Sequence, residues 1–132
     1  RLQQVFINLV RNAMESTEDK VRIRVNASPC GRHTPTLPDD AEVIGNPNCG
    51  AGGGRSHTQI TIEDDGPGID PEILPRIFDP FFTTHEPGRG YGLGLYIVQE
   101  IIQEHEGCIA VASAPGRGTR FLLRLPCAEE ND

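Results

Sequence analysis

Two glycine-rich segments hold the residues of this 132-residue chain whose types and spacing best suit chemistry. In the first, Asp64 ends an alternating apolar run and is followed by Gly66 and Gly68. A partly shielded carboxylate can accept a hydrogen bond from an exocyclic amine, whereas it repels the carbonyl of an oxopurine. Glycine lets the backbone come close to a flat base. The segment therefore suits the amino edge of adenine, and a plain Asp-Gly turn after a strand is the alternative.

The second segment, Gly88-Arg89-Gly90-Tyr91-Gly92-Leu93-Gly94, runs directly into an apolar stretch with helical spacing. Exposed N–H groups and the helix dipole favour a polyphosphate at such a helix start. The polar residues 83–87 that precede it are expected to be mobile, as a lid must be. No G-x-x-x-x-G-K-[ST] motif occurs in the chain. The two segments together predict ATP binding without a P-loop, and a flexible hinge is the alternative for the second.

Asn8 and Asn12 are four positions apart in a predicted helix and therefore lie on one face of it. Asparagine is a poor residue for the middle of a helix, so a pair at this spacing calls for a reason. An amide oxygen can bind Mg²⁺, which takes few protein ligands together with substrate phosphates. The alternative is two polar residues on the flank of an ordinary helix.

Periodicity defines the elements that must position these residues. Apolar residues at helical spacing predict helices at 2–14 and 93–106, and alternating ones predict strands at 21–26 and 58–63. Turn residues at 114–118 predict a hairpin whose strands are 108–113 and 119–125. Asp70-Pro71-Glu72 predicts the start of a short helix. The proline- and glycine-rich residues 28–57 predict a long mobile loop. This order predicts an α+β, two-layer sandwich in which helices cover one face of a mixed, mostly antiparallel sheet.

Composition limits the possible partners and the domain count. The length predicts one domain over 1–127, followed by an acidic tail at 128–132. The formal net charge of −7 argues against binding to nucleic acid or to an anionic membrane surface. The chain has no apolar stretch long enough to span a membrane. Because it begins within a helical pattern, we expect it to be a domain of a longer protein.

The four cysteines have two interpretations. None forms a C-x-x-C motif, so free thiols in a reducing, cytoplasmic compartment are expected. The alternative is a zinc site in the irregular segment, built from Cys30, His33, Cys49 and His57. The phenylalanines 78, 81 and 82 are likewise expected to pack in the core, or else to gate the lid by docking into it.

The order of these motifs resembles the ATP-binding catalytic domain of bacterial two-component sensor histidine kinases. The resemblance covers most of residues 1–126, and its motifs are Asn8-Leu9-Val10-Arg11-Asn12-Ala13, Asp64 to Gly68, Phe78 to Phe82, Gly90 to Leu95, and Gly116-Arg117-Gly118-Thr119. It implies the Bergerat-type fold shared with gyrase, mismatch-repair and heat-shock chaperone ATPases.

The resemblance also implies roles for individual residues. Asn12 would bind Mg²⁺, with Asn8 assisting near the phosphates, and Thr119 would support the Asp64 network through water. Arg89 would neutralise charge on the transferring phosphoryl group. The full set implied to bind ATP is Asn8, Asn12, Asp64, Gly66, Gly68, Ile69, Phe78, Gly90, Tyr91, Gly92, Leu93, Gly94, Leu95 and Thr119.

The same resemblance implies partners. The γ-phosphoryl group would go to a histidine on a separate helical-hairpin domain of the same protein, which would also be the dimerisation domain. A response regulator would act downstream, and the parent protein could be membrane-anchored while this domain makes no membrane contact.

One position separates phosphoryl transfer from ATP hydrolysis. Members that hydrolyse ATP resemble E-x-x-x-N, in which the glutamate activates water, whereas this chain has Asn8 four positions before Asn12. An amide does not accept a proton usefully, so slow intrinsic ATPase activity is expected. The alternatives are a related ATPase, a kinase acting on serine, or a non-catalytic ATP-binding regulatory module.

Overall fold

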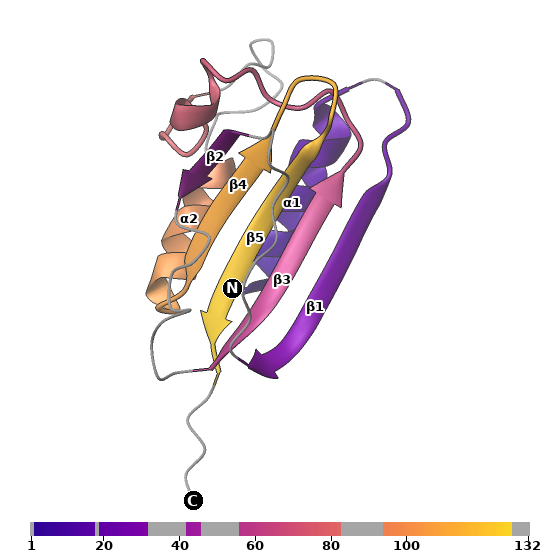
Figure 1. Ribbon diagram of the computed structural model, residues 1–132. Coiled ribbons are helices and arrows are strands. Elements are labelled where there is room, and N and C mark those ends of the chain that lie inside the picture. The colour runs from indigo at the N-terminus through magenta and orange to yellow at the C-terminus, as the bar shows by residue number, and fades with distance from the viewer. Residues whose placement is uncertain (1, 18, 32–41, 46–55, 83–93, 128–132) are drawn as a thin grey trace, which may run out of the picture.

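The computed structural model describes residues 2–17, 19–31, 42–45, 56–82 and 94–127 as one α+β sandwich (Figure 1). The elements in chain order are α1 (Leu2–Glu15), β1 (Ile23–Gly31), β2 (Glu42–Gly45), β3 (His57–Asp64), the 3₁₀ helix η1 (Leu74–Arg76), α2 (Gly94–Glu104), β4 (Cys108–Ser113) and β5 (Thr119–Pro126). In these ranges, no helix is both long and apolar enough to cross a membrane.

The five strands form a single sheet in the order β1-β3-β5-β4-β2. Each of its four pairings is antiparallel, so the described strands contain no parallel pair. Both α-helices lie on the same face of this sheet, α1 behind β3 and β5 and α2 behind β4 (Figure 1). The predicted α+β architecture with helices on one face is confirmed.

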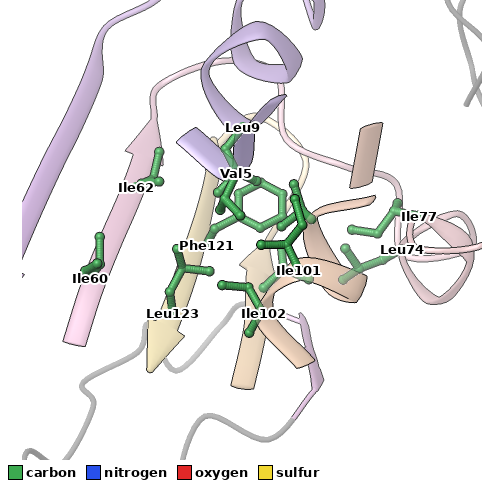
Figure 2. Packing of buried hydrophobic residues seen from close by; sticks show 12 residues of the cluster. Val5, Leu9, Ile60, Ile62, Leu74, Ile77, Ile101, Ile102, Phe121 and Leu123 are labelled. Atoms are coloured by element: carbon green, nitrogen blue, oxygen red, sulfur yellow. The ribbon is translucent and has the colours of Figure 1, made fainter. Parts of the chain in front are cut away.

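The core lies between the helices and the inner face of the central strands (Figure 2). In α1, Val5 and Leu9 are fully buried because they belong to one stripe of helical spacing. Alternate residues of the strands meet them from the sheet, as the two-residue period of a strand requires; the remaining core residues are Ile60, Ile62, Leu74, Ile77, Val98, Ile101, Ile102, Val111, Phe121 and Leu123. Each such side chain contributes roughly 1.5–3 kcal/mol when fully buried.

The prediction of a continuous loop over 28–57 is wrong, because strands occupy both ends and part of the middle of this range. β1 continues to Gly31, β2 occupies 42–45, and β3 begins at His57; residues 32–41 and 46–55 lie outside the described part. The extended β1 is antiparallel to β3, and β2 is antiparallel to β4, so cross-strand hydrogen bonds override the local proline and glycine content. Pro29 is tolerated because β1 is an edge strand whose register shifts between Ser28 and Gly31.

The short helix predicted after Asp70 exists in a reduced form. The Glu72 N–H donates to the Asp70 side chain at 2.8 Å, as the predicted cap requires. Only Leu74–Arg76 is helical, and it is a 3₁₀ turn. α2 ends at Glu104, two residues before the predicted end at 106, because Glu106 takes the left-handed conformation (φ 59°) and the Gly107 N–H donates to the Ile102 carbonyl.

The cysteine predictions are corrected by the tertiary structure. Cys30 and Cys127 form a disulfide between the end of β1 and the residue after β5, and Cys108 is also disulfide-bonded. These sulfurs are therefore neither free thiols nor, for Cys30, a zinc ligand. The sequence could not show the pairing because the two cysteines are 97 positions apart and meet only through the β1-β3-β5 strand order. His33 and Cys49 lie outside the described residues.

Candidate functional site

The predicted functional segments lie together at one end of the sandwich. The C-terminal end of α1, the end of β3, the β4–β5 turn and the start of α2 all lie at the same end of the sheet (Figure 1). Antiparallel pairing causes this, because β3 ends where β5 begins: Asp64 is opposite Thr119. Residues from four distant segments can therefore act on one ligand there.

A row of three polar residues crosses the sheet at this end. Asp64 of β3 is opposite Thr119 of β5, and Thr119 is opposite Ser113 of β4. Directly opposite residues in antiparallel strands point to the same face. The row continues the core-facing side of the strands, where Ser113 is only 1% exposed and Thr119 only 7% exposed. The buried core thus ends in polar side chains at this point.

Asp64 has an unusual electrostatic environment for a carboxylate. Burial raises its pKa above the ordinary value, and the neighbouring charge of Asp65 adds to this. Hydrogen bonds from the backbone N–H groups of Gly66 and Thr119 act in the opposite direction, and the Gly66 bond is 2.9 Å long. The carboxylate is held in place by the backbone and partly shielded from water, so it can discriminate among hydrogen-bond donors.

The loop that follows Asp64 is locked to the β4–β5 turn. The Gly116 N–H donates to the Pro67 carbonyl at 2.7 Å. Gly68 (φ 78°) lies so close to the turn that a Cβ there would collide with the Ala114 carbonyl oxygen. A Cβ on Gly118 (φ 79°) would collide in the same way with the Asp64 carbonyl oxygen. Only glycine fits these two positions, and the loop therefore has a fixed shape before any ligand arrives.

The two asparagines of α1 have different surroundings. Asn8 is buried; its amide nitrogen donates to the Gly94 carbonyl at 3.1 Å, and its amide oxygen accepts from Gln4 Nε2 at 2.6 Å. Asn12 lies one turn nearer the polar row and is half-buried. Asn8 thus fastens the start of α2 to α1, whereas Asn12 is the more accessible amide.

The phenylalanines do not form one cluster. Phe78 packs against the core, and the Phe82 ring lies 4.7 Å from the Arg76 guanidinium carbon. Phe81 is 72% exposed at φ 67°, so the core-packing interpretation is wrong for this residue.

The second glycine segment is described only at its end. Arg89, Gly90, Tyr91, Gly92 and Leu93 lie outside the described residues. Gly94 opens α2, and a Cβ added there would meet no atom within 4 Å among the described residues outside its own helix backbone. Leu95 is half-buried against the core.

Sequence reasoning did not single out Ser113 or Gln4 as site residues. Ser113 accepts a hydrogen bond from the Ile69 N–H at 2.8 Å and so supports the loop after Asp64. The predicted hairpin already made Ser113 and Thr119 its closing pair, and a polar pair at the end of two apolar strands was the available signal. Gln4 carried no such signal, because its bond to the Asn8 amide orients the contact between Asn8 and Gly94, which only the folded structure shows.

The chain is similar in sequence to known histidine kinases over nearly its whole length. The family model described as "Histidine kinase-, DNA gyrase B-, and HSP90-like ATPase" matches residues 1–129. The sensory histidine kinase/phosphatase NtrB of Rhodobacter capsulatus is 42% identical over 128 residues, which cover 97% of this chain and 32% of that protein. The chain therefore spans about a third of the length of this curated relative.

Solved structures agree with the sequence relatives. The catalytic domain of histidine kinase ThkA superposes with a TM-score of 0.65 at 28% identity, covering 95% of this chain and 65% of that one. Full-length ShkA in complex with AMPPNP gives a TM-score of 0.67 at 28% identity, covering 98% of this chain and 22% of that one.

Proposed function

This chain belongs to the family of histidine kinase-, DNA gyrase B- and HSP90-like ATPases, and we propose that it binds ATP and delivers the γ-phosphoryl group to a histidine of the longer protein that contains it. It is the catalytic ATPase domain of a two-component sensor histidine kinase. The acceptor histidine belongs to a separate helical-hairpin domain that also provides dimerisation, and a response regulator receives the phosphoryl group afterwards.

The observation that carries the proposal is the fixed, half-buried carboxylate of Asp64. The backbone N–H groups of Gly66 and Thr119 hold it at the end of the buried row. It accepts a hydrogen bond from the exocyclic amine of adenine and repels the carbonyl of an oxopurine. Gly68 has no side chain and packs against the Ala114 carbonyl, so the backbone there can lie close to a flat base.

The phosphates are assigned to the start of α2 and to Asn12. N–H groups at a helix N-terminus attract anions, and Gly94 leaves this helix start without a side chain. Arg89 to Leu93 provide the remaining phosphate contacts in this proposal. The Asn12 amide oxygen is a hard ligand of the type that Mg²⁺ accepts, and the ion neutralises phosphate charge when bound. Ile69, Phe78 and Leu95 complete the apolar surroundings.

Transfer to a protein nucleophile is favoured over hydrolysis by the surroundings of Asn8. Its oxygen accepts from Gln4 and its nitrogen donates to Gly94, so both ends of the amide are engaged in structural bonds. A water molecule receives no general base from this position. An acceptor histidine needs none, because its imidazole supplies its own lone pair.

The test is phosphotransfer from γ-labelled ATP with Mg²⁺ in the full-length protein, compared with Asp64→Ala. Acid-labile, base-stable label on the protein that is lost in the variant supports a histidine kinase that uses this site. Asp19→Ala is the matched control, since Asp19 is exposed and lies in the turn after α1. It should keep the label.

The remaining outcomes separate the alternatives. Acid-stable label indicates a kinase acting on serine. Free phosphate without labelled protein indicates an ATPase and contradicts the argument from Asn8. ATP binding without either product indicates a regulatory module.

A further inference from the structure

Ser113 connects three parts of the candidate site through one hydroxyl group. It is the last residue of β4, and its side chain is almost completely buried. Its oxygen lies 2.8 Å from the Ile69 nitrogen, 3.0 Å from the Gly118 carbonyl oxygen and 3.0 Å from Thr119 Oγ1. The loop after Asp64, the β4–β5 turn and the first residue of β5 therefore meet at this atom.

The chemistry of these partners fixes the direction of each hydrogen bond. The Ile69 N–H can only donate, so the Ser113 oxygen accepts from it. The Gly118 carbonyl can only accept, so it takes the single Ser113 proton. With that proton committed, the contact between Ser113 and Thr119 forms only if Thr119 donates. The Thr119 proton consequently points away from Asp64 and toward Ser113.

Because its proton is directed at Ser113, the Thr119 oxygen can offer a ligand only its lone pairs, as a hydrogen-bond acceptor. Thr119 is directly opposite Asp64, whose carboxylate is also an acceptor. Two acceptors side by side suit an amino group, which has two N–H donors. They reject a carbonyl group, because its lone pairs would face theirs without a proton between them.

We propose that Ser113 is a positioning residue for purine selection. By accepting hydrogen bonds from the Thr119 hydroxyl and the Ile69 N–H, it keeps Thr119 and Asp64 as an edge that offers only hydrogen-bond acceptors to the 6-position of the purine. This inference rests on the proposed function, since it concerns the base-binding part of the same site. Ser113 acts through Thr119 and the loop and does not touch the nucleotide.

The test compares the dissociation constants of ATP and inosine triphosphate for the full-length protein in the presence of Mg²⁺. The two nucleotides differ only at the base edge, where adenine has a 6-amino group and an unprotonated N1 and hypoxanthine has a 6-oxo group and an N1–H, so the ratio of their dissociation constants reports the edge and not general stability. We expect the parent protein to prefer ATP. Ser113→Ala should reduce that preference roughly tenfold, because Thr119 can then turn its proton toward the base. Ser113→Thr, which keeps a hydroxyl, should retain most of the preference.

Thr119→Val tests the same edge without touching Ser113. It removes the hydroxyl, so it should lower the preference by a similar factor, and combining it with Ser113→Ala should lower it no further. Ser28→Ala, which changes a serine of the edge strand β1, is the matched control and should leave the ratio unchanged.

The outcomes distinguish this inference from the proposed function. If the parent protein prefers ATP and Ser113→Ala keeps the parental ratio, the inference is overturned while the proposed function stands. If the parent binds neither nucleotide, both are overturned. Should Ser113→Ala fail to fold, Thr119→Val and Thr119→Ser provide the test. An unchanged preference for ATP over inosine triphosphate in Thr119→Val overturns the inference. Loss of that preference in Thr119→Val, together with its retention in Thr119→Ser, supports the inference.

Discussion

The amide nitrogen of Asn8 donates a hydrogen bond to the backbone carbonyl of Gly94, across 86 positions of the chain. The carbonyl can only accept, so the orientation of the amide is fixed, and Gln4 confirms it by donating to the amide oxygen. This bond joins α1 to the first residue of α2, the helix start that we assign to phosphate binding. Asn8, at the position where a hydrolase has its general base, therefore has a structural role in this chain, because its amide links α1 to α2 by a hydrogen bond.

Replacing Asn8 with a carboxylate tests whether the lack of a general base at this position keeps ATP hydrolysis slow. Asn8→Glu should keep ATP binding within a few-fold and raise phosphate release roughly tenfold, below the ~10²–10⁴-fold typical of a well-placed general base. Phosphate release should be measured at saturating ATP. Asn8→Gln is the control, because it has the same length as Glu without a basic group. An equal increase in both variants would show that loosening the Gly94 contact, and not base catalysis, is responsible.

The raised pKa of Asp64 predicts a pH-dependent cost to folding. The folded state binds the Asp64 proton more tightly than the unfolded chain does, because burial disfavours the charge. The resulting stability is present below the ordinary carboxyl pKa and is lost as pH rises through the folded-state pKa. Asp64→Asn should therefore raise the nucleotide-free melting temperature at pH 7 and flatten its decline between acidic and neutral pH.

The same variant should bind ATP at least tenfold more weakly, since a hydrogen bond to a charged acceptor contributes roughly 1.5–3 kcal/mol. Melting curves from pH 4 to 8 and ATP titrations measure both effects. Asp19→Asn is the matched control and should change neither. A variant less stable than the parent at pH 7 would contradict the burial argument.

Gly68 and Gly116 have nearly the same backbone conformation, so alanine variants at the two positions distinguish the effect of a steric collision from the effect of backbone strain. Gly68 and Gly116 have φ values of 78° and 77°, but only at Gly68 would a Cβ collide with neighbouring backbone. An alanine costs roughly 1–2 kcal/mol at either position for its left-handed conformation. Gly68→Ala should lose roughly 1–3 kcal/mol more, because the loop must move away from Ala114.

Urea unfolding and ATP titration of both variants check this prediction. Gly116→Ala should bind ATP nearly as well as the parent, whereas Gly68→Ala should bind it poorly. Equal losses of stability in the two variants would mean that the turn yields easily and that the loop is not locked to it.

The Cys30–Cys127 disulfide predicts a redox-dependent stability. It closes a stretch of 97 positions, and a bond over so long a loop typically stabilises a protein by about 2–4 kcal/mol. Cys30→Ser/Cys127→Ser should lose that amount under oxidising conditions, as measured by urea unfolding. Reduction should destabilise the parent more than the double variant, in which Cys108 remains bonded until the reductant is added. Identical unfolding midpoints for the two oxidised proteins would contradict the pairing.

The local pattern of the sequence determined most elements and the motifs. Helical spacing of Val5 and Leu9 identified α1, alternation identified β3, and the turn residues at 114–118 identified the hairpin of β4 and β5, because each signal depends only on neighbouring residues. Asp64 and the glycines after it could be recognised for the same reason. A short segment already contains the carboxylate, the turn residues and the strand that ends before them.

The tertiary structure alone decided which of these residues meet. β2 and the end of β1 have weak local signals and form because β4 and β3 offer them backbone hydrogen-bonding partners. The disulfide, the Asn8–Gly94 bond and the row of Ser113, Thr119 and Asp64 all depend on the strand order and on α1 lying against α2. Such contacts join positions far apart in the chain, where periodicity has no information, so only the folded sheet reveals them.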